Sequence, residues 1–182
     1  MTEIIPEKRL DSVLIHDGEI LKLKLDQVLL PNGHTANREV VIHPGGVVII
    51  PFTPEGKFVL VKQFRYPVGE VLWEFPAGRL NPGEEPRLAA ERELKEETGF
   101  QGGELKDLGK IYTAPGFCDE ILYFYLATEI QPGEARPDHD EFVEALTFTS
   151  QEVEDYIHAA MIKDAKTIVG FLKAKEALSK NF

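Results

Sequence analysis

Alternating apolar and polar residues near the start of the chain predict a small group of β-strands. Leu21–Leu25 alternates strictly between leucine and lysine, as a strand with one buried face does. The turn signals Asp17-Gly18 and Pro31-Asn32-Gly33 flank it, and a further short strand is expected over 38–42. Residues 1–43 are therefore expected to form a small antiparallel β unit, which has little core of its own and should pack on something.

Short apolar runs continue through the middle of the chain, and a helical pattern follows them. Further strands are expected over 46–50, 57–61, 72–75, 108–112, 121–127 and 144–148. One helix is expected inside this series, at about 85–98, and two after it, the first with Ser150 as its N-cap and the second over about 164–179. In the last helix Ile168, Phe171, Leu172 and Leu178 are the apolar positions. Strands first and helices last indicate an α+β fold.

Three glutamates share one face of the helix expected at 85–98. Glu93, Glu96 and Glu97 lie at i, i+3 and i+4, which places their side chains side by side. Like charges at this spacing destabilise a helix, and a divalent cation with oxygen ligands would compensate for them. Taken alone, such a run is more often a solvated acidic helix face.

The residues around these glutamates decide between the two interpretations. Residues 78–100 fit the pattern Gly-x5-Glu-x7-Arg-Glu-U-x-Glu-Glu-x-Gly-U, where U is a bulky apolar residue. Every specified position is filled, by Gly78, Glu84, Arg92, Glu93, Leu94, Glu96, Glu97, Gly99 and Phe100. This pattern is the Nudix box, so the segment resembles the catalytic loop–helix–loop of Nudix hydrolases. The resemblance implies the Nudix fold over residues 44–182, a mixed β-sheet sandwiched between helices (α/β/α).

The box also fits an ordinary helix at its two ends. Pro86 suits the first helical turn, where its missing N–H has no partner to lose. Gly99 is expected to be a left-handed C-terminal cap. Leu88, Ala89 and Leu94 can supply the buried side of the helix.

The resemblance assigns roles within the box. It implies that Glu93 and Glu97 bind a metal directly, that Glu96 binds it directly or through water, and that the backbone carbonyl of Ala77 is a further ligand. Arg92 would pair with a glutamate of the box and hold its geometry, and we count Arg92 and Glu97 among the catalytic residues. The implied cofactor is Mg²⁺, or Mn²⁺. For Glu84 a purely structural or capping role is as well supported as a functional role in the box.

A second segment narrows the resemblance to one subgroup. The run Ala114-Pro-Gly-Phe-Cys-Asp-Glu120 begins shortly after the box and resembles ADP-ribose pyrophosphatases, although its Pro115-Gly116 is also an ordinary tight turn between strands. The segments 43–45, 61–65 and 74–78 resemble the same subgroup. The implied reaction is the hydrolysis of ADP-ribose to AMP and ribose 5-phosphate. The alternatives are another nucleoside diphosphate sugar, such as ADP-glucose or GDP-mannose, and a non-catalytic module that senses ADP-ribose.

The same resemblance implies four substrate-binding residues. Arg65 would bind the diphosphate, because its planar fork suits paired phosphate oxygens; the alternative is a surface ion pair. Glu74 would shape the site, and Glu120 would contribute to the substrate or metal site. Arg38 is a second candidate arginine for the substrate.

The resemblance also implies a general base in an acidic loop far from the box in sequence, which here is the segment 137–144. Glu141 is our choice, with Asp140 and Glu144 as rivals and a solvated acidic loop as the alternative. Histidine is a residue type often used as a general base, but His139 is less favoured.

Composition limits the classes of partner. The chain has 20 basic and 31 acidic residues, a net charge of −11, which disfavours nucleic acid or an anionic membrane as a partner. Bound cations can invert the local sign for a diphosphate substrate. Cys118 is the only cysteine, which suits a reducing cytosol, and no run approaches the ~20 apolar residues of a membrane span. The first ten residues show no signal-peptide pattern, so we expect a cytoplasmic protein.

The N-terminal unit has an implied role in assembly. The resemblance implies a homodimer in which residues 1–43 reach the partner subunit and complete the nucleotide site. The weak core of this unit is consistent with that arrangement.

Overall fold

The computed structural model describes residues 5–136 and 142–180. Contacts along the chain divide it into two compact units. The smaller unit runs to Gly45 and also includes Tyr112–Ile121, so a segment from the middle of the chain belongs to it. The larger unit consists of Gly46–Ile111 and the chain from Leu122 onward.

Two sheets form the centre of the larger unit. The first is mixed, because β4 pairs with β9 in parallel and with β7 antiparallel. Its strand order is β7 (Ala77–Arg79), β4 (Gly46–Pro51), β9 (Ile121–Thr128), β8 (Glu104–Tyr112). The second is antiparallel, in the order β10 (Val143–Phe148), β5 (Phe58–Arg65), β6 (Glu70–Glu74).

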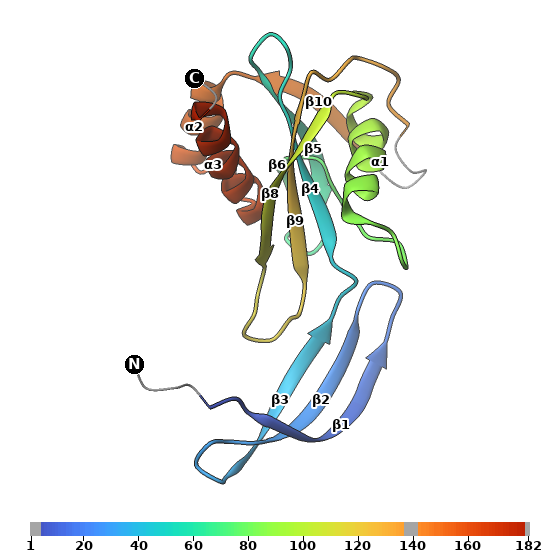
Figure 1. Cartoon of the computed structure of the whole chain (residues 1–182), viewed down its shortest axis with the longest axis vertical. Helices are drawn as coiled ribbons and strands as arrows, with labels where there is room; N and C mark the ends of the chain where they lie inside the picture. Colours follow the sequence, from blue (N-terminus) through green and yellow to red (C-terminus); the bar gives the residue numbers. More distant parts are fainter. Residues whose placement is uncertain (1–4, 137–141, 181–182) are drawn as a thin grey trace. The chain divides into compact units, whose positions relative to one another are not determined.

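Helices cover both sides of these strands. Figure 1 shows α1 (Pro86–Thr98) on one side and α2 (Ser150–His158) with α3 (Ala165–Ser179) on the other. The predicted α/β/α arrangement with a mixed sheet is therefore confirmed. The short strand β7, which carries the start of the box, was not predicted.

β4 is buried along its whole length because its side chains alternate between two hydrophobic cores. Val47 and Ile49 pack with Leu94 and the buried alanines of α1. Val48 and Ile50 point the other way and pack in the core that includes residues of α2 and α3. Burial on both faces explains why this strand reads as a continuous apolar run.

The ends of α1 agree with the sequence, but its buried face differs in part. Pro86 is its first residue, and Gly99 caps it at φ 75° by donating its N–H to the carbonyl of Lys95. The prediction for Leu88 was wrong, because this side chain is exposed. The buried stripe lies one position further along the helix and consists of Ala89, Ala90, Glu93, Leu94 and Glu97. Two glutamates thus occupy positions where a helix normally buries apolar residues.

The first turn of α2 is capped by Thr149, not by Ser150 as predicted. Thr149 has extended dihedral angles and its hydroxyl accepts the N–H of Glu152, while Glu152 Oε2 accepts the N–H of Thr149 at 2.7 Å. Ser150 is already the first helical residue, so it cannot act as the cap. The pair Thr149 and Glu152 forms a capping box.

This cap gives a direct comparison of two neighbouring hydroxyls. We expect T149A to lower the free energy of unfolding by about 1 kcal/mol, because the first turn loses an acceptor for its N–H groups. S150A should change it by less than about 0.5 kcal/mol, as surface substitutions usually do. Urea denaturation of both variants measures the difference, and equal effects would contradict this assignment.

α3 begins at an aspartate cap and packs through part of its predicted apolar face. Asp164 accepts the N–H of Thr167 and caps the helix. Phe171 is buried, and Ile168 and Leu178 pack at the edge of the core. Leu172, a further apolar residue of this helix, is 60% exposed and lies outside the packed face.

The smaller unit is an antiparallel sheet with an added segment. Its strands β1 (Lys8–Asp17), β2 (Lys22–Leu29) and β3 (Thr35–Ile42) pair in sequence order. β1 is exposed along its entire length. Its sequence therefore lacks the alternation of apolar and polar residues that marks a half-buried strand. At the other edge the N–H of Val41 donates to the carbonyl of Phe117 at 2.7 Å, and the N–H of Asp119 donates to the carbonyl of Val41. The segment around Pro115 is thereby attached to β3.

Within the described ranges, none of the helices has both the length and the apolar character needed to cross a membrane.

Candidate active site

The first glycine of the box, Gly78, makes room for the Glu93 side chain of the helix. Gly78 lies in β7, where it pairs with Val47 of β4. A Cβ atom added at Gly78 would lie 1.8 Å from Glu93 Oε1 and 2.0 Å from Glu93 Cδ. The carboxylate of Glu93 therefore lies directly against the backbone of β7, and no side chain fits between them.

Arg92 gathers three glutamates of the box around one guanidinium group. Its Nε and Nη2 donate to the two carboxylate oxygens of Glu84, at 3.0 and 3.1 Å. Its Nη1 donates to Glu93 Oε1 at 2.6 Å and to Glu96 Oε2 at 3.0 Å. Glu84 also accepts the N–H of Asn81, so it fixes the turn before the helix. The pairing expected for Arg92 is present, and the contacts of Glu84 fit its structural interpretation.

These contacts change the titration of both partners. The pKa of Arg92 is raised above its ordinary value, chiefly by hydrogen bonds to Glu84 and further by Glu93 and Glu96, although partial burial works against this. The pKa of Glu84 is lowered by its hydrogen bonds from Arg92 and from the backbone of Asn81. Arg92 thus keeps its charge at every ordinary pH and favours the ionised form of Glu84 beside it.

The glutamates of α1 form an oxygen-rich face that is partly withdrawn from solvent. Glu93 is 7% exposed and Glu97 is 4% exposed, while Glu96 is half-buried. Residues 5–136 and 142–180 contain no group of three or more acidic, histidine or cysteine side chains already converging on one metal position. Arg92 Nη1 instead bridges Glu93 and Glu96. The carboxylate oxygens of this face suit a hard divalent cation, which would share them with Arg92.

Arg65 and Glu74 form a second polar group in the same unit. Arg65 donates from Nε and Nη2 to the two oxygens of Glu74, at 2.8 and 2.7 Å, and the Glu74 side chain is buried. The pKa of Arg65 is raised, first by these hydrogen bonds and also by the charge of Glu97. The structure thus brings Arg65 and Glu74 together and places Arg65 within the electrostatic reach of the box.

The other two predicted substrate residues lie in the smaller unit. Arg38 pairs with Glu7 through two hydrogen bonds, at 2.6 and 3.1 Å, and borders a cavity of about 440 Å³. Pro115, Phe117 and Tyr112 also line this cavity. The segment that resembled ADP-ribose pyrophosphatases therefore shares a cavity with Arg38.

Glu120 is the last residue of this segment and has polar partners of its own. It accepts the hydroxyl of Thr113 at 2.7 Å, and His43 Nδ1 lies 3.3 Å from its other oxygen.

Comparison with known families matches this geometry. The NUDIX domain matches residues 42–168, and the nucleoside diphosphate sugar hydrolase N-terminal domain matches residues 7–41. The chain belongs to the Nudix family. The glutamates gathered by Arg92 are accordingly those of a Nudix hydrolase box.

Individual relatives cover nearly the whole chain. A methanol dehydrogenase activator of Bacillus methanolicus is 42% identical over 182 residues, 98% of each chain. An ADP-ribose pyrophosphatase of Bacillus subtilis (strain 168) is 41% identical over 178 residues, 96% of each chain. Among solved structures, an ADP compounds hydrolase has a TM-score of 0.89 at 20% identity and covers 100% of this chain and 98% of its own, which shows the shared fold.

The predicted base lies outside the described residues. Glu141 and its rival Asp140 fall in the range 137–141, so their role stays a prediction. Glu144 is described: it is exposed in β10 and pairs in register with Lys62 of β5.

Sequence reasoning missed one member of the polar group around Glu74. Lys166 of α3 also donates to Glu74 Oε2 and lies 3.0 Å from Asp164 Oδ1. The available signal was a lysine in the first turn of a helix, where the helix dipole disfavours a cation. The Nudix box gave no such signal, because Lys166 lies far beyond it in sequence.

Proposed function

We propose that this Nudix hydrolase cleaves the diphosphate of ADP-ribose with water, giving AMP and ribose 5-phosphate. The observation that carries the proposal is the complete box in its folded form, with Glu93 against Gly78 and Arg92 joining Glu84, Glu93 and Glu96. The choice of substrate is supported by 41% identity to an ADP-ribose pyrophosphatase over 96% of both chains.

The proposed cofactor is Mg²⁺, with Mn²⁺ as a substitute. Carboxylate and carbonyl oxygens are the ligands that such hard cations prefer, and Glu93, Glu96, Glu97 and the carbonyl of Ala77 would hold the ion. When bound, the cation would supply neutralisation of the diphosphate charge and a more acidic water.

The remaining chemistry is assigned to side chains of the protein. Arg65 would orient the diphosphate with the part of its guanidinium group that does not contact Glu74. Arg92 would keep the box carboxylates in place, and Glu141 would accept a proton from the attacking water. Arg38 would be a second substrate-binding arginine, and Glu120 would contribute to the substrate or metal site. Positively charged groups and precise positioning are what the transfer of a phosphoryl group from the diphosphate to water mainly requires.

Two other functions are favoured by particular relatives. A GDP-mannose pyrophosphatase of Escherichia coli is 28% identical over 84% of this chain, so a different nucleoside diphosphate sugar is the nearest alternative. The relative from Bacillus methanolicus is named for activation of a methanol dehydrogenase, and an accessory role towards a dehydrogenase is a second candidate. The intact glutamate set weighs against a sensor without activity.

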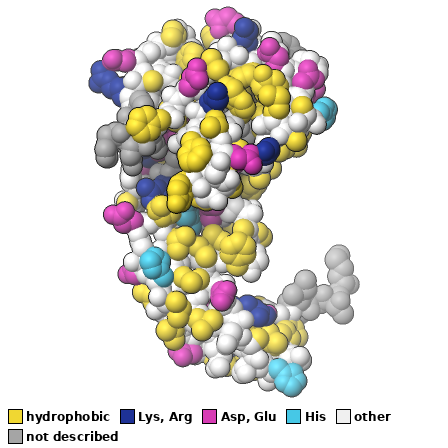
Figure 2. All heavy atoms as spheres, turned by 180° about the vertical axis from the view of Figure 1, so that it is seen from behind, with side chains coloured by type: hydrophobic (Ala, Val, Ile, Leu, Met, Phe, Trp, Pro, Cys, Tyr) yellow, Lys and Arg dark blue, Asp and Glu magenta, His cyan; other side chains and the backbone are white. Residues whose placement is uncertain are grey.

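Assembly is part of the same proposal. The N-terminal strands expose several apolar side chains, and Figure 2 shows hydrophobic groups on the surface of this unit, the lower part of the view. The exposed set includes Leu10, Val13, Leu14, Ile15, Ile20 and Leu21. Exposed apolar side chains gathered on one unit are typical of an interface, which supports the proposed homodimer.

A substrate panel tests the function. ADP-ribose, ADP-glucose and GDP-mannose would be supplied at equal concentration with Mg²⁺, and the products identified. We expect the highest kcat/KM with ADP-ribose and release of AMP. A higher kcat/KM with another nucleotide sugar would change the proposed substrate but leave the proposed chemistry unchanged. No turnover of any of them, together with stimulation of a dehydrogenase, would favour the accessory role.

A further inference from the structure

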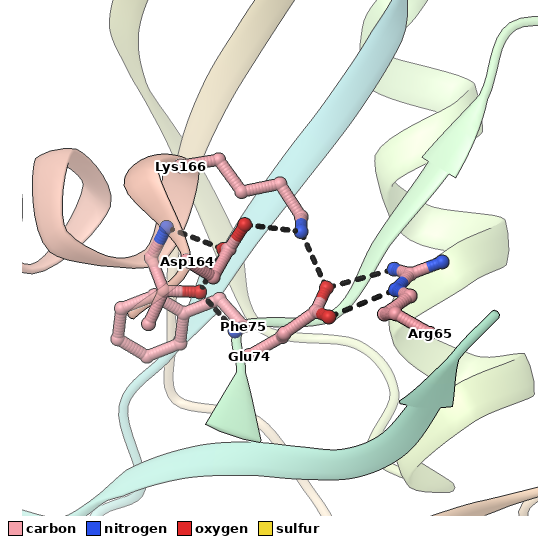
Figure 3. Close-up of polar contacts among 6 residues, drawn as sticks. Arg65, Glu74, Phe75, Asp164 and Lys166 are labelled. Carbon is pink, nitrogen blue, oxygen red and sulfur yellow. Dashed lines mark hydrogen bonds and ion pairs between the residues drawn. The ribbon is translucent and has the colours of Figure 1, made fainter. Parts of the chain in front are cut away.

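A buried carboxylate lies at the centre of a charged network in the larger unit (Figure 3). Glu74, at the end of β6, has a side chain that is 1% exposed. Arg65 binds it through two parallel hydrogen bonds from the end of β5. Lys166 binds the same carboxylate from α3, and its Nζ donates to the oxygen Oε2 that also accepts Arg65 Nη2. Two cations from two different elements therefore fix one carboxylate.

Lys166 is held in place although its position in the helix disfavours it. It is the second residue of α3, where the positive end of the helix dipole repels a cation. The N-cap Asp164 offsets this repulsion, since its Oδ1 lies 3.0 Å from Lys166 Nζ. The start of the helix is itself tied to the end of β6, because the N–H of Phe75 donates to Thr167 Oγ1 at 2.9 Å. A residue that breaks a local preference and yet has buried, well-defined partners points to a role beyond the helix.

The charges show how the network is stabilised. Burial alone would raise the pKa of Glu74, but Arg65 and Lys166 outweigh it, so the pKa is lowered. Glu74 is consequently ionised, and its orientation depends on both cations. The network borders the candidate active site through β5, which ends at Arg65 and contacts the box helix α1.

We propose that Lys166 is a positioning residue of the active site. It fixes the carboxylate of Glu74, and this carboxylate sets the plane and direction of the Arg65 guanidinium group that faces the diphosphate. The inference rests on the proposed function, because it takes Arg65 as the group that binds the diphosphate. A shift of about 1 Å in such a group can lower turnover by about 100-fold.

A neighbouring lysine provides the matched control. Lys163 comes from the segment just before α3 and also pairs with a glutamate of β6, namely Glu70. Both members of that pair are about half-exposed, so solvent can replace the contact. We expect K166M to lower kcat/KM for ADP-ribose by about 10- to 100-fold. K163M should stay within about 2-fold of the native protein, as expected for an exposed pair.

Further variants distinguish a positioning role of Lys166 from a general loss of stability. K166R keeps a cation beside Glu74 and should recover kcat/KM to within about 3-fold of the native value, since charge and donor are both retained. In the E74Q background the carboxylate is gone, so K166M should lower kcat/KM by less than about 3-fold. If K166M does not fold, K166Q replaces it, because glutamine keeps a donor without the charge. Thermal unfolding of every variant identifies losses that come from unfolding.

The possible results distinguish a failure of the proposed function from a failure of the role proposed for Lys166. Native protein that does not hydrolyse ADP-ribose would refute the proposed function. Native activity combined with a K166M effect equal to that of K163M would refute the role of Lys166 alone. An undiminished K166M effect in the E74Q background would also overturn it, because Lys166 would then not act through Glu74.

Discussion

E93Q is expected to lower kcat for ADP-ribose by about 10³-fold, the scale of losing one preorganised charge contact at a reacting centre. Glu93 lies against Gly78 and accepts a hydrogen bond from Arg92, so its carboxylate has one defined place in the site. Glutamine has nearly the same volume, and the fold should persist. Because Glu93 lies beside the like charges of Glu96 and Glu97, loss of its charge also relieves repulsion within the helix. The thermal midpoint without added metal should therefore fall little.

Glu91 supplies the control in the same helix. Its side chain is exposed and pairs only loosely with Arg87, at 3.6 Å. E91Q should keep kcat within about 2-fold of the native value, since an exposed pair contributes little. Steady-state kinetics of both variants, with Mg²⁺ binding measured by calorimetry, checks the prediction. An E93Q protein with native kcat would show that Glu93 is not a metal ligand.

G78A should have the second largest effect on activity and stability, because the added methyl group has no room. Gly78 does not adopt a positive φ, so its backbone does not require glycine. The added methyl group, however, would overlap the carboxylate of Glu93 at 1.8 Å. We expect the free energy of unfolding to fall by about 1–3 kcal/mol, as overpacking usually does, and kcat to fall by about 100-fold as Glu93 moves.

The E93A background tests the cause of the G78A effect. When Glu93 is shortened to alanine the overlap disappears, so G78A should lower the thermal midpoint much less there than in the native protein. Equal destabilisation in both backgrounds would show that the methyl group clashes with something else. Activity is not the readout in this background, since E93A is itself expected to be inactive.

The sequence predicted those parts of the fold that local patterns determine. The apolar run of β4 and the helix from Pro86 to Gly99 were found because burial on both faces and helix-end chemistry leave a local signal. β1 left no signal, because all of its residues are exposed and its place is set by pairing with β2. Leu88 was assigned to the buried face of its helix although it is exposed, because hydrophobicity alone does not fix which face of a helix is buried.

The candidate site also has features that the sequence could predict and others that it could not. The glutamates of the box could be predicted because their spacing is contained within one helix. The contact of Glu93 with Gly78 and the contribution of Lys166 could not, because each depends on how distant strands and helices pack. Contacts between residues 74 and 166 have no counterpart in a local sequence pattern. The same holds for the cavity shared by Arg38 and Pro115.

The most direct test of the account is ADP-ribose hydrolysis by the native protein as Mg²⁺ is titrated, with the products identified. The account predicts turnover that rises from near zero to saturation with Mg²⁺ and yields AMP and ribose 5-phosphate in equal amounts. Full turnover in the presence of a chelator, or cleavage at a bond other than the diphosphate, would contradict it.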